Sequence, residues 1–237
     1  MPSFIPGGPK GHSDLKFGYK KLREVGTPVE KIAKLKNSIV VAKTTIGIFY
    51  GTLADADVGI IVNPTNRDCI LIPQGITGDL IATEGPLLPI LAFHGGAIEY
   101  GQVKITKVRS LHAEYVMHLA IDPNPVERQE NDAPLTEEAK LDLVRYCTLN
   151  ALAEAEKMAN SLNKKSIAFP ALGTDIHGIR PGEAVKIMLA AIAEYAKTSS
   201  LEKIQIILHN EGYFYEFNRE LNQLQAKIRN AALLTAK

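Results

Sequence analysis

The sequence is short of cysteine, of unbalanced charge and of long apolar runs, and each shortage excludes a class of protein. Its two cysteines, Cys69 and Cys147, make neither a disulfide framework nor a paired metal-ligand spacing. Its 27 basic residues are matched by 26 acidic ones, so it lacks the basic excess with which dedicated nucleic-acid binders neutralise phosphates. Nucleic acid therefore stays open as a partner but is not favoured.

Membrane segments and metal sites are not indicated either. No stretch reaches the roughly 18–20 uninterrupted apolar residues that cross a bilayer. Residues 1–13, rich in Gly and Pro, do not have the pattern of a signal peptide. The histidines show no ligand spacing such as H-x-x-x-H. We therefore expect a cytoplasmic protein with no membrane anchor, no metal and no cofactor, and the sequence does not indicate its oligomeric state.

What is present is the pattern of an α/β protein, with 46% hydrophobic residues to build a core. Short runs of branched apolar residues, typical of strands buried on both faces, predict strands at 39–44, 46–50, 58–62, 102–108, 114–121, 166–169 and 203–208. Helices are predicted at 76–84, 87–93, from Thr136 to about 162, at 181–197 and at the C-terminal end. Strands and helices alternate in the second half, which favours a mostly parallel sheet with helices on both faces.

The domain organisation predicted is an extension, residues 1–36, followed by one α/β domain, residues 37–237. Within the extension, Thr27-Pro28-Val29-Glu30 has the form of a capping box with proline at the first helical position, which predicts a short helix to about Lys36. This helix is either a solvated segment packed at the edge of the domain or an arm that docks a partner.

In such sheets ligands bind outside the carboxyl ends of the strands, so the loops 63–75, 170–181 and 209–215 are the candidate site. The first loop opens with Asn63 and Asn66, which need hydrogen-bond partners if they are buried. Asn63 could tie down the loop, and Asn66 could do the same or offer its amide to a ligand hydroxyl. Gly75 and Gly78 would let backbone amides approach an anion at the start of the next helix.

The second loop has three glycines and feeds a helix. It is either a cradle for phosphate, through backbone donors and the Thr174 hydroxyl, or a plain connection. Neither a P-loop nor a dinucleotide-binding fingerprint occurs in the chain, which disfavours an NAD(P)-dependent oxidoreductase.

Taken together, these loops resemble those of macro domains. Gly-Thr-Leu at 51–53, Ile-Ile-Val-Asn-Pro-Thr-Asn at 60–66 and Gln-Gly-Ile at 74–76 are similar to the family's G-D-I, A-I-V-N-A-A-N and G-G-G-V. Ser-Ile-Ala-Phe-Pro-Ala-Leu-Gly-Thr at 166–174 with Ile-His-Gly at 176–178 is similar to S-I-A-F-P-A-I-x-T-G-x-x-G. Gly101, Thr106 and His118 also fall at family positions, and the resemblance covers roughly residues 39–224.

The resemblance implies a three-layer αβα sandwich with a mixed, mostly parallel central sheet and a cleft for ADP-ribose. Asn66 would meet the distal ribose, and the turn at Asn210 and Phe214 would cover the adenine, although Phe214 could equally pack in the core. Main-chain donors would wrap the diphosphate from Gln74, Gly75, Ile76, Gly173, Thr174, Asp175, Ile176, His177 and Gly178.

The departures from the family pattern matter as much. Thr52 stands where the family has the aspartate that accepts from the adenine amino group, a role that Asp55 or Asp57 could take over. Asp175 stands where glycine is usual, so its carboxylate points away from the diphosphate, weakens binding or marks a different ligand.

A further departure concerns catalysis. The hydrolytic branch of the family uses an aspartate and a histidine at the positions of Thr77 and Ile81, so that acid–base route is not supported. If there is catalysis, Asn66 and His177 are the candidates. With a pKa near ~6.5, His177 could donate a proton, contact phosphate or merely shield the ligand.

The leading hypothesis is a module that binds ADP-ribose or ADP-ribosylated protein, with hydrolysis at the distal ribose left open. The alternative is a non-catalytic macro fold with an eroded pocket that acts in protein binding or in the binding of poly-adenylate RNA. Whether the protein is an enzyme stays open, because no general base is visible by spacing.

Overall fold

A computed structural model describes residues 36–121, 135–174 and 179–235. Residues 27–35 of the predicted N-terminal helix lie outside these ranges, and Lys36, its predicted last residue, begins the first strand. The division of the chain into an extension and a domain stays a prediction.

The centre of the fold is a seven-stranded sheet in the order β1-β2-β7-β6-β3-β5-β4. The inner strands β2, β7, β6, β3 and β5 pair in parallel, whereas the edge strands β1 and β4 pair antiparallel to their neighbours. The mixed, mostly parallel sheet predicted from the sequence is thus confirmed. The strands are β1 (Lys36–Val41), β2 (Thr44–Tyr50), β3 (Ile60–Thr65), β4 (Val103–Lys107), β5 (Tyr115–Ala120), β6 (Ser166–Phe169) and β7 (Lys203–Leu208).

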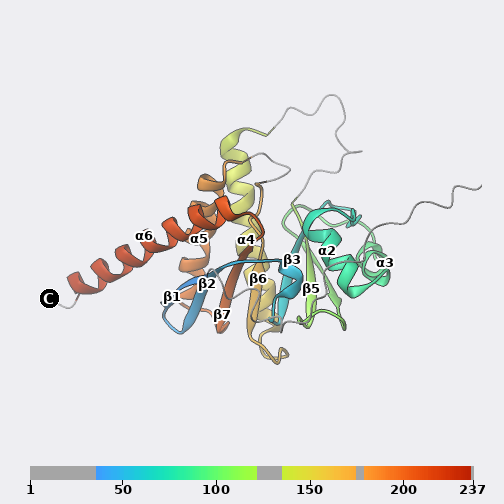
Figure 1. The fold of residues 1–237 in the computed structure, drawn as a ribbon, viewed down its shortest axis with the longest axis horizontal. Helices are drawn as coiled ribbons and strands as arrows, with labels where there is room; N and C mark the ends of the chain where they lie inside the picture. Colours follow the sequence, from blue (N-terminus) through green and yellow to red (C-terminus); the bar gives the residue numbers. More distant parts are fainter. Residues whose placement is uncertain (1–35, 122–134, 175–178, 236–237) are drawn as a thin grey trace, which may run out of the picture.

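Helices cover both faces of this sheet, which makes three layers (Figure 1). One face carries α4 (Glu137–Met158), α5 (Pro181–Ala196) and α6 (Glu211–Thr235). The other carries α2 (Gly75–Glu84), α3 (Leu87–Phe93) and the short 3-10 helix η1 (Leu53–Asp55). Within the described ranges no single helix is long and apolar enough to cross a membrane, and α2 and α3, which together have the length and composition, are bent by 115° at their junction.

The branched runs are explained by a core on each side of the sheet. In β3, Ile60 and Val62 belong to the core under α4, α5 and α6, while Ile61 belongs to the core under α2 and α3. Successive strand side chains point to opposite faces, so a strand covered on both sides must be apolar throughout. Burial on both faces was also predicted for the first run, residues 39–44, and there the prediction is wrong. β1 is an edge strand with one covered face, which leaves Val40 63% exposed.

The long helix α4 shows how local signals set the helices. The Thr136 hydroxyl accepts from the amide of Ala139 at 3.2 Å, which is the predicted N-cap. Its predicted apolar stripe is buried at Val144, Cys147 and Ala151, and this stripe holds α4 against the sheet.

Candidate functional site

The two predicted loops leave neighbouring strands and lead to opposite faces of the sheet. β3 continues into α2 on one face, whereas β6, which pairs with β3 through Ile60 and Ile167, continues into α5 on the other. A crevice opens where adjacent parallel strands send their connections to opposite faces, and ligands bind there. The site predicted at the carboxyl ends of the strands therefore lies at such a switch point.

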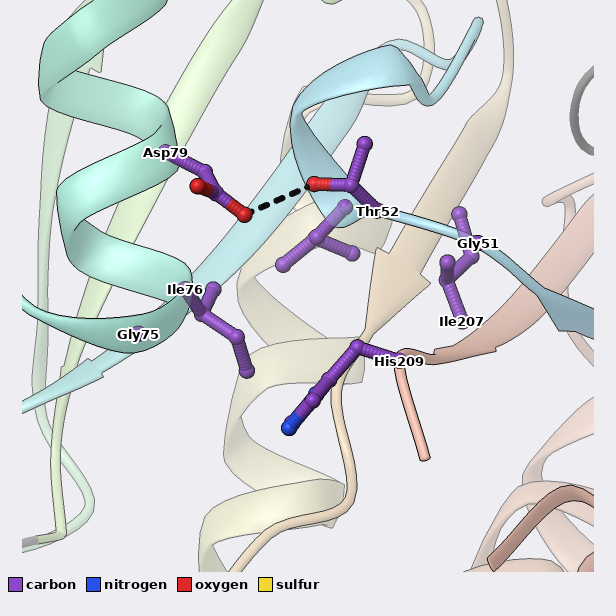
Figure 2. A pocket seen from close by; sticks show the side chains of 8 residues that line it. Gly51, Thr52, Gly75, Ile76, Asp79, Ile207 and His209 are labelled. Carbon is purple, nitrogen blue, oxygen red and sulfur yellow. Dashed lines mark hydrogen bonds between the residues drawn. The ribbon is translucent and has the colours of Figure 1, made fainter. Parts of the chain in front are cut away.

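A pocket of about 180 Å³ opens at this edge of the sheet (Figure 2). It lies between the ends of β2 and β7, the 3-10 helix η1 and the first turns of α2. Three of the predicted ligand-binding residues, Thr52, Gly75 and Ile76, are brought together in its wall. The full lining is Gly51, Thr52, Leu53, Gly75, Ile76, Asp79, Ile207 and His209.

Asp79 is a lining residue that the sequence did not single out, whereas His209 is the first residue of the predicted loop 209–215. Asp79 follows Ile76 by three residues on α2, and positions three apart lie on the same face of a helix. That spacing was the available signal for Asp79. His209 follows β7, and it shares the pocket wall with residues 51–53 because β7 pairs with β2.

The start of α2 presents backbone donors at the pocket. Gln74, the N-cap residue, makes no side-chain capping hydrogen bond, and the first amide bonded within the helix is that of Gly78, to the Gln74 carbonyl at 3.0 Å. The amides of Gly75, Ile76 and Thr77 come before that bond and have no acceptor within the helix. Together with the helix dipole, they make this end of α2 a suitable place for an anion.

Gly75 keeps this end of the helix open. Its φ is +52°, and a Cβ added there would meet no atom within 4 Å. The exposed backbone can therefore approach a ligand closely, as the sequence predicted for this glycine.

Asn63 holds α2 on the sheet through a buried chain of side chains. The Thr77 hydroxyl donates to Asn63 Oδ1 at 2.9 Å, and Asn63 Nδ2 lies 3.4 Å from Nδ1 of His118. The other ring nitrogen of His118 lies 3.1 Å from the Thr106 hydroxyl. Since an amide nitrogen can only donate, Nδ1 of His118 accepts and Nε2 carries the proton.

β3 runs further than the sequence indicated. Asn63, Pro64 and Thr65 were predicted as loop, yet they pair with His118, Leu119 and Ala120 of β5. Asn63 therefore ties α2 to the sheet rather than tying down a loop. Thr65 Oγ1 is buried without a hydrogen-bond partner among the described residues.

The protonation of His118 couples this network to pH. The ring is fully buried, and burial, followed by the charge of Lys104, lowers its pKa from 6.5 to about 4. Because the unfolded chain binds a proton at this residue between pH 6.5 and 4 and the folded chain does not, stability falls as the pH falls through that window. The expected loss is up to about 3 kcal/mol.

Urea unfolding at pH 7 and pH 4.5 checks this prediction. His118→Gln, which keeps a donor and an acceptor but cannot titrate, should show a smaller loss than the wild type. Equal losses in the two proteins would mean that folding does not lower the pKa of His118.

Asn66 is held by the backbone of its own loop. Its Nδ2 donates to the Ile70 carbonyl at 3.3 Å, and its Oδ1 accepts from the Ile70 amide at 3.1 Å. The residue is 5% exposed. The sequence allowed two roles for Asn66, tying down the loop and contacting the ribose. These bonds match the first role, and the ribose contact stays a prediction.

In the second loop the structure describes Gly173 and Thr174, whereas Asp175, Ile176, His177 and Gly178 lie outside the described residues. Gly173 has a φ of +77°, and a Cβ there would meet Val144 and Ile179 at 2.7 and 2.9 Å. The Thr174 hydroxyl donates to the Ala171 carbonyl at 3.1 Å. Its proton is thus engaged within the loop, and the predicted phosphate contacts of this loop stay predictions.

In the turn after β7, Asn210 caps α6 and Phe214 packs in the core, and the adenine cover stays a prediction. Asn210 Oδ1 accepts from the amide of Tyr213 at 3.2 Å, which makes Asn210 a cap of α6. Phe214 is 3% exposed and belongs to the core. Its position supports core packing, the second role that the sequence left open, and neither residue lines the described pocket.

The structure shows where the carboxylates lie that could replace the family's aspartate at the position of Thr52. Asp57 pairs with Lys164. These two residues precede β3 and β6, so the pair lies at the amino ends of the strands, away from the pocket. Asp55 lies in η1 but does not line the described pocket. Asp79 does line it, and its Oδ2 accepts from the Thr52 hydroxyl at 3.1 Å, as Figure 2 shows.

Comparison with known proteins places these features in a family. The sequence model described as Macro domain matches residues 62–188. The macro domain-containing protein TTE0995 of Caldanaerobacter subterraneus is 25% identical over 77% of this chain and 98% of that protein. The O-acetyl-ADP-ribose deacetylase of Shigella dysenteriae is 26% identical over 76% of this chain and 97% of its own length. The ADP-ribose glycohydrolase MACROD2 of Xenopus laevis is 27% identical over 82% of this chain and 43% of its own length.

Solved structures show the same fold. The Oceanobacillus iheyensis macrodomain with ADP matches with a TM-score of 0.68 and 22% identity, over 81% of this chain and 98% of that one.

Proposed function

Because this chain belongs to the macro domain family, we propose that the pocket at the carboxyl ends of its parallel strands binds ADP-ribose or an ADP-ribosyl group on a protein. The resemblance found in the sequence is confirmed by the family match and by the fold. The observation that supports the proposal most strongly is the uncapped start of α2 beside a pocket at the carboxyl ends of β2 and β7.

The charges of the site favour one orientation of the ligand in the pocket. The amides of Gly75, Ile76 and Thr77 offer positive partial charge to a diphosphate. The Asp79 carboxylate, one turn further along α2, repels phosphate and would keep it away from that part of the pocket. Apolar side chains of Leu53, Ile76 and Ile207 line the same part and suit a planar base. We therefore place the base beside Thr52 and Asp79 and the diphosphate at the start of α2.

The chemistry beyond binding is limited at two positions. The hydroxyl of Thr77 donates to Asn63 and has no ionisation near neutral pH, and Ile81 has no titratable group. The aspartate–histidine route of the hydrolytic branch is therefore not supported here, and we propose binding as the central activity. If turnover occurs, His177 and Asn66 remain the sequence-based candidates for it.

Calorimetric titration of the full chain with ADP-ribose tests the proposal. We expect saturable heat below millimolar ligand, together with a rise in Tm, because a ligand at 100 times its Kd stabilises the folded state by about 2.7 kcal/mol. No heat and no thermal shift at millimolar ADP-ribose would overturn the proposal. That result would favour the alternative, a macro fold whose pocket no longer binds ADP-ribose. Titration with poly-adenylate RNA would then test the RNA-binding form of this alternative.

Incubation with mono-ADP-ribosylated protein or O-acetyl-ADP-ribose separates reader from hydrolase. Intact substrate after incubation supports a reader. Product release that His177→Ala abolishes would instead assign a hydrolytic role to the second loop.

A further inference from the structure

We propose that Asp79 determines which base this pocket accepts, by receiving a hydrogen bond from the exocyclic amino group of a 6-amino purine. The inference rests on the proposed function, since it needs a purine nucleotide in this pocket. It assigns base selectivity to a residue of α2. The resemblance to the family instead implied an aspartate after β2, at the position of Thr52.

The first support is the position of the carboxylate. Asp79 lies one helical turn beyond Ile76 and points across the pocket at Thr52 (Figure 2). The two side chains come from segments separated by the whole of β3 and its loop, and their 3.1 Å hydrogen bond joins the end of β2 to α2. The carboxylate is therefore held in the wall of the pocket, close to the position after β2 where Thr52 stands.

The second support is the direction of that hydrogen bond. The Thr52 oxygen already accepts from the amide of Ala54, at 3.4 Å, as the cap of η1. Its single proton can then go to Asp79, which fixes Asp79 as an acceptor. An ionised carboxylate has about four acceptor sites, and Thr52 uses one of them. Among the described residues no Lys, Arg or His makes a salt bridge with Asp79.

The third support is the chemistry of the remaining wall. Leu53, Ile76 and Ile207 are apolar, so a ring can pack on them without losing hydrogen bonds. A carboxylate at the edge of such a ring needs a donor opposite it. An amino group supplies one, whereas a ring carbonyl would place lone pairs against a negative charge. The pocket should therefore accept a 6-amino purine and disfavour a 6-oxo purine.

The test compares ADP-ribose with inosine diphosphate ribose, which has a 6-oxo base and the same diphosphate and riboses. Calorimetry on the full wild-type chain should give at least about tenfold tighter binding of ADP-ribose. Asp79→Asn, whose amide can both donate and accept, should bring the ratio of the two Kd values close to one or reverse it. The ratio is the readout, because removal of a negative charge can change both affinities together.

Asp55→Asn is the matched control. It makes the same change of charge in the neighbouring helix η1, at a residue outside the pocket lining. This variant should keep the wild-type ratio, and unchanged Tm values for both variants show that the fold is intact. Thr52→Val should reduce the ratio, because it removes the donor that holds Asp79.

The outcomes separate this inference from the proposed function. If the wild type binds neither ligand, the proposed function fails, and the inference fails with it. If the wild type binds both equally, or if Asp79→Asn keeps the preference for ADP-ribose, the inference fails while the proposed function stands.

Discussion

Gly75→Glu is expected to weaken the binding of ADP-ribose by at least about tenfold relative to Gly75→Gln. Gly75 is the first residue of α2, and its amide is one of those without an acceptor inside the helix. A carboxylate at this position would compete with a diphosphate for the same donors and repel it. At ~4 Å, two like charges near a protein surface cost about 4 kcal/mol.

Gly75→Gln is the matched control because the positive φ of Gly75 penalises both side chains equally. The two side chains also have the same shape, and neither Cβ meets an atom within 4 Å. Calorimetric titration of both variants with ADP-ribose isolates the effect of charge. Equal affinities would place the diphosphate away from the start of α2.

Gly173→Ala should lower the free energy of unfolding by about 2–5 kcal/mol, the sum of two effects. The φ of +77° costs a non-glycine residue about 1–2 kcal/mol. The new methyl would also press on Val144 and Ile179, which are buried in the core. Overpacking of this kind costs about 1–3 kcal/mol.

Gly96→Ala separates the two effects. Gly96 has a φ of +84°, and nothing lies within 4 Å of its added Cβ, so only the backbone cost of about 1–2 kcal/mol applies. Urea unfolding of both variants gives the comparison. If Gly173→Ala costs no more than Gly96→Ala, then Gly173 is not held against α4 as the structure has it.

The architecture was predictable because its signals are local. β6 and β7 have the predicted bounds. Lys165 and Pro170 border the first of these runs, and Glu202 and His209 border the second. The Thr136 cap and the apolar stripe of α4 were likewise present in the sequence. The exposed face of β1 was not predictable, because burial on both faces depends on which strands become edges. That order comes from long-range pairing.

The candidate site was predictable in part, for the same reason. Thr52, Gly75 and Ile76 line one pocket because motifs placed them after strands that turned out to be parallel. Asp79 was missed because the family motif ends at Ile76, and its importance depends on Thr52 standing across the pocket. Whether Phe214 covers a base or fills the core depends on packing around α6, which the residue type alone does not decide.

A crystal structure of this protein with ADP-ribose is the most direct test of the account. It should show the diphosphate oxygens within hydrogen-bond distance of the Gly75, Ile76 and Thr77 amides, and the adenine amino group at Asp79. A diphosphate beside Asp79, or a ligand bound away from the start of α2, would contradict it.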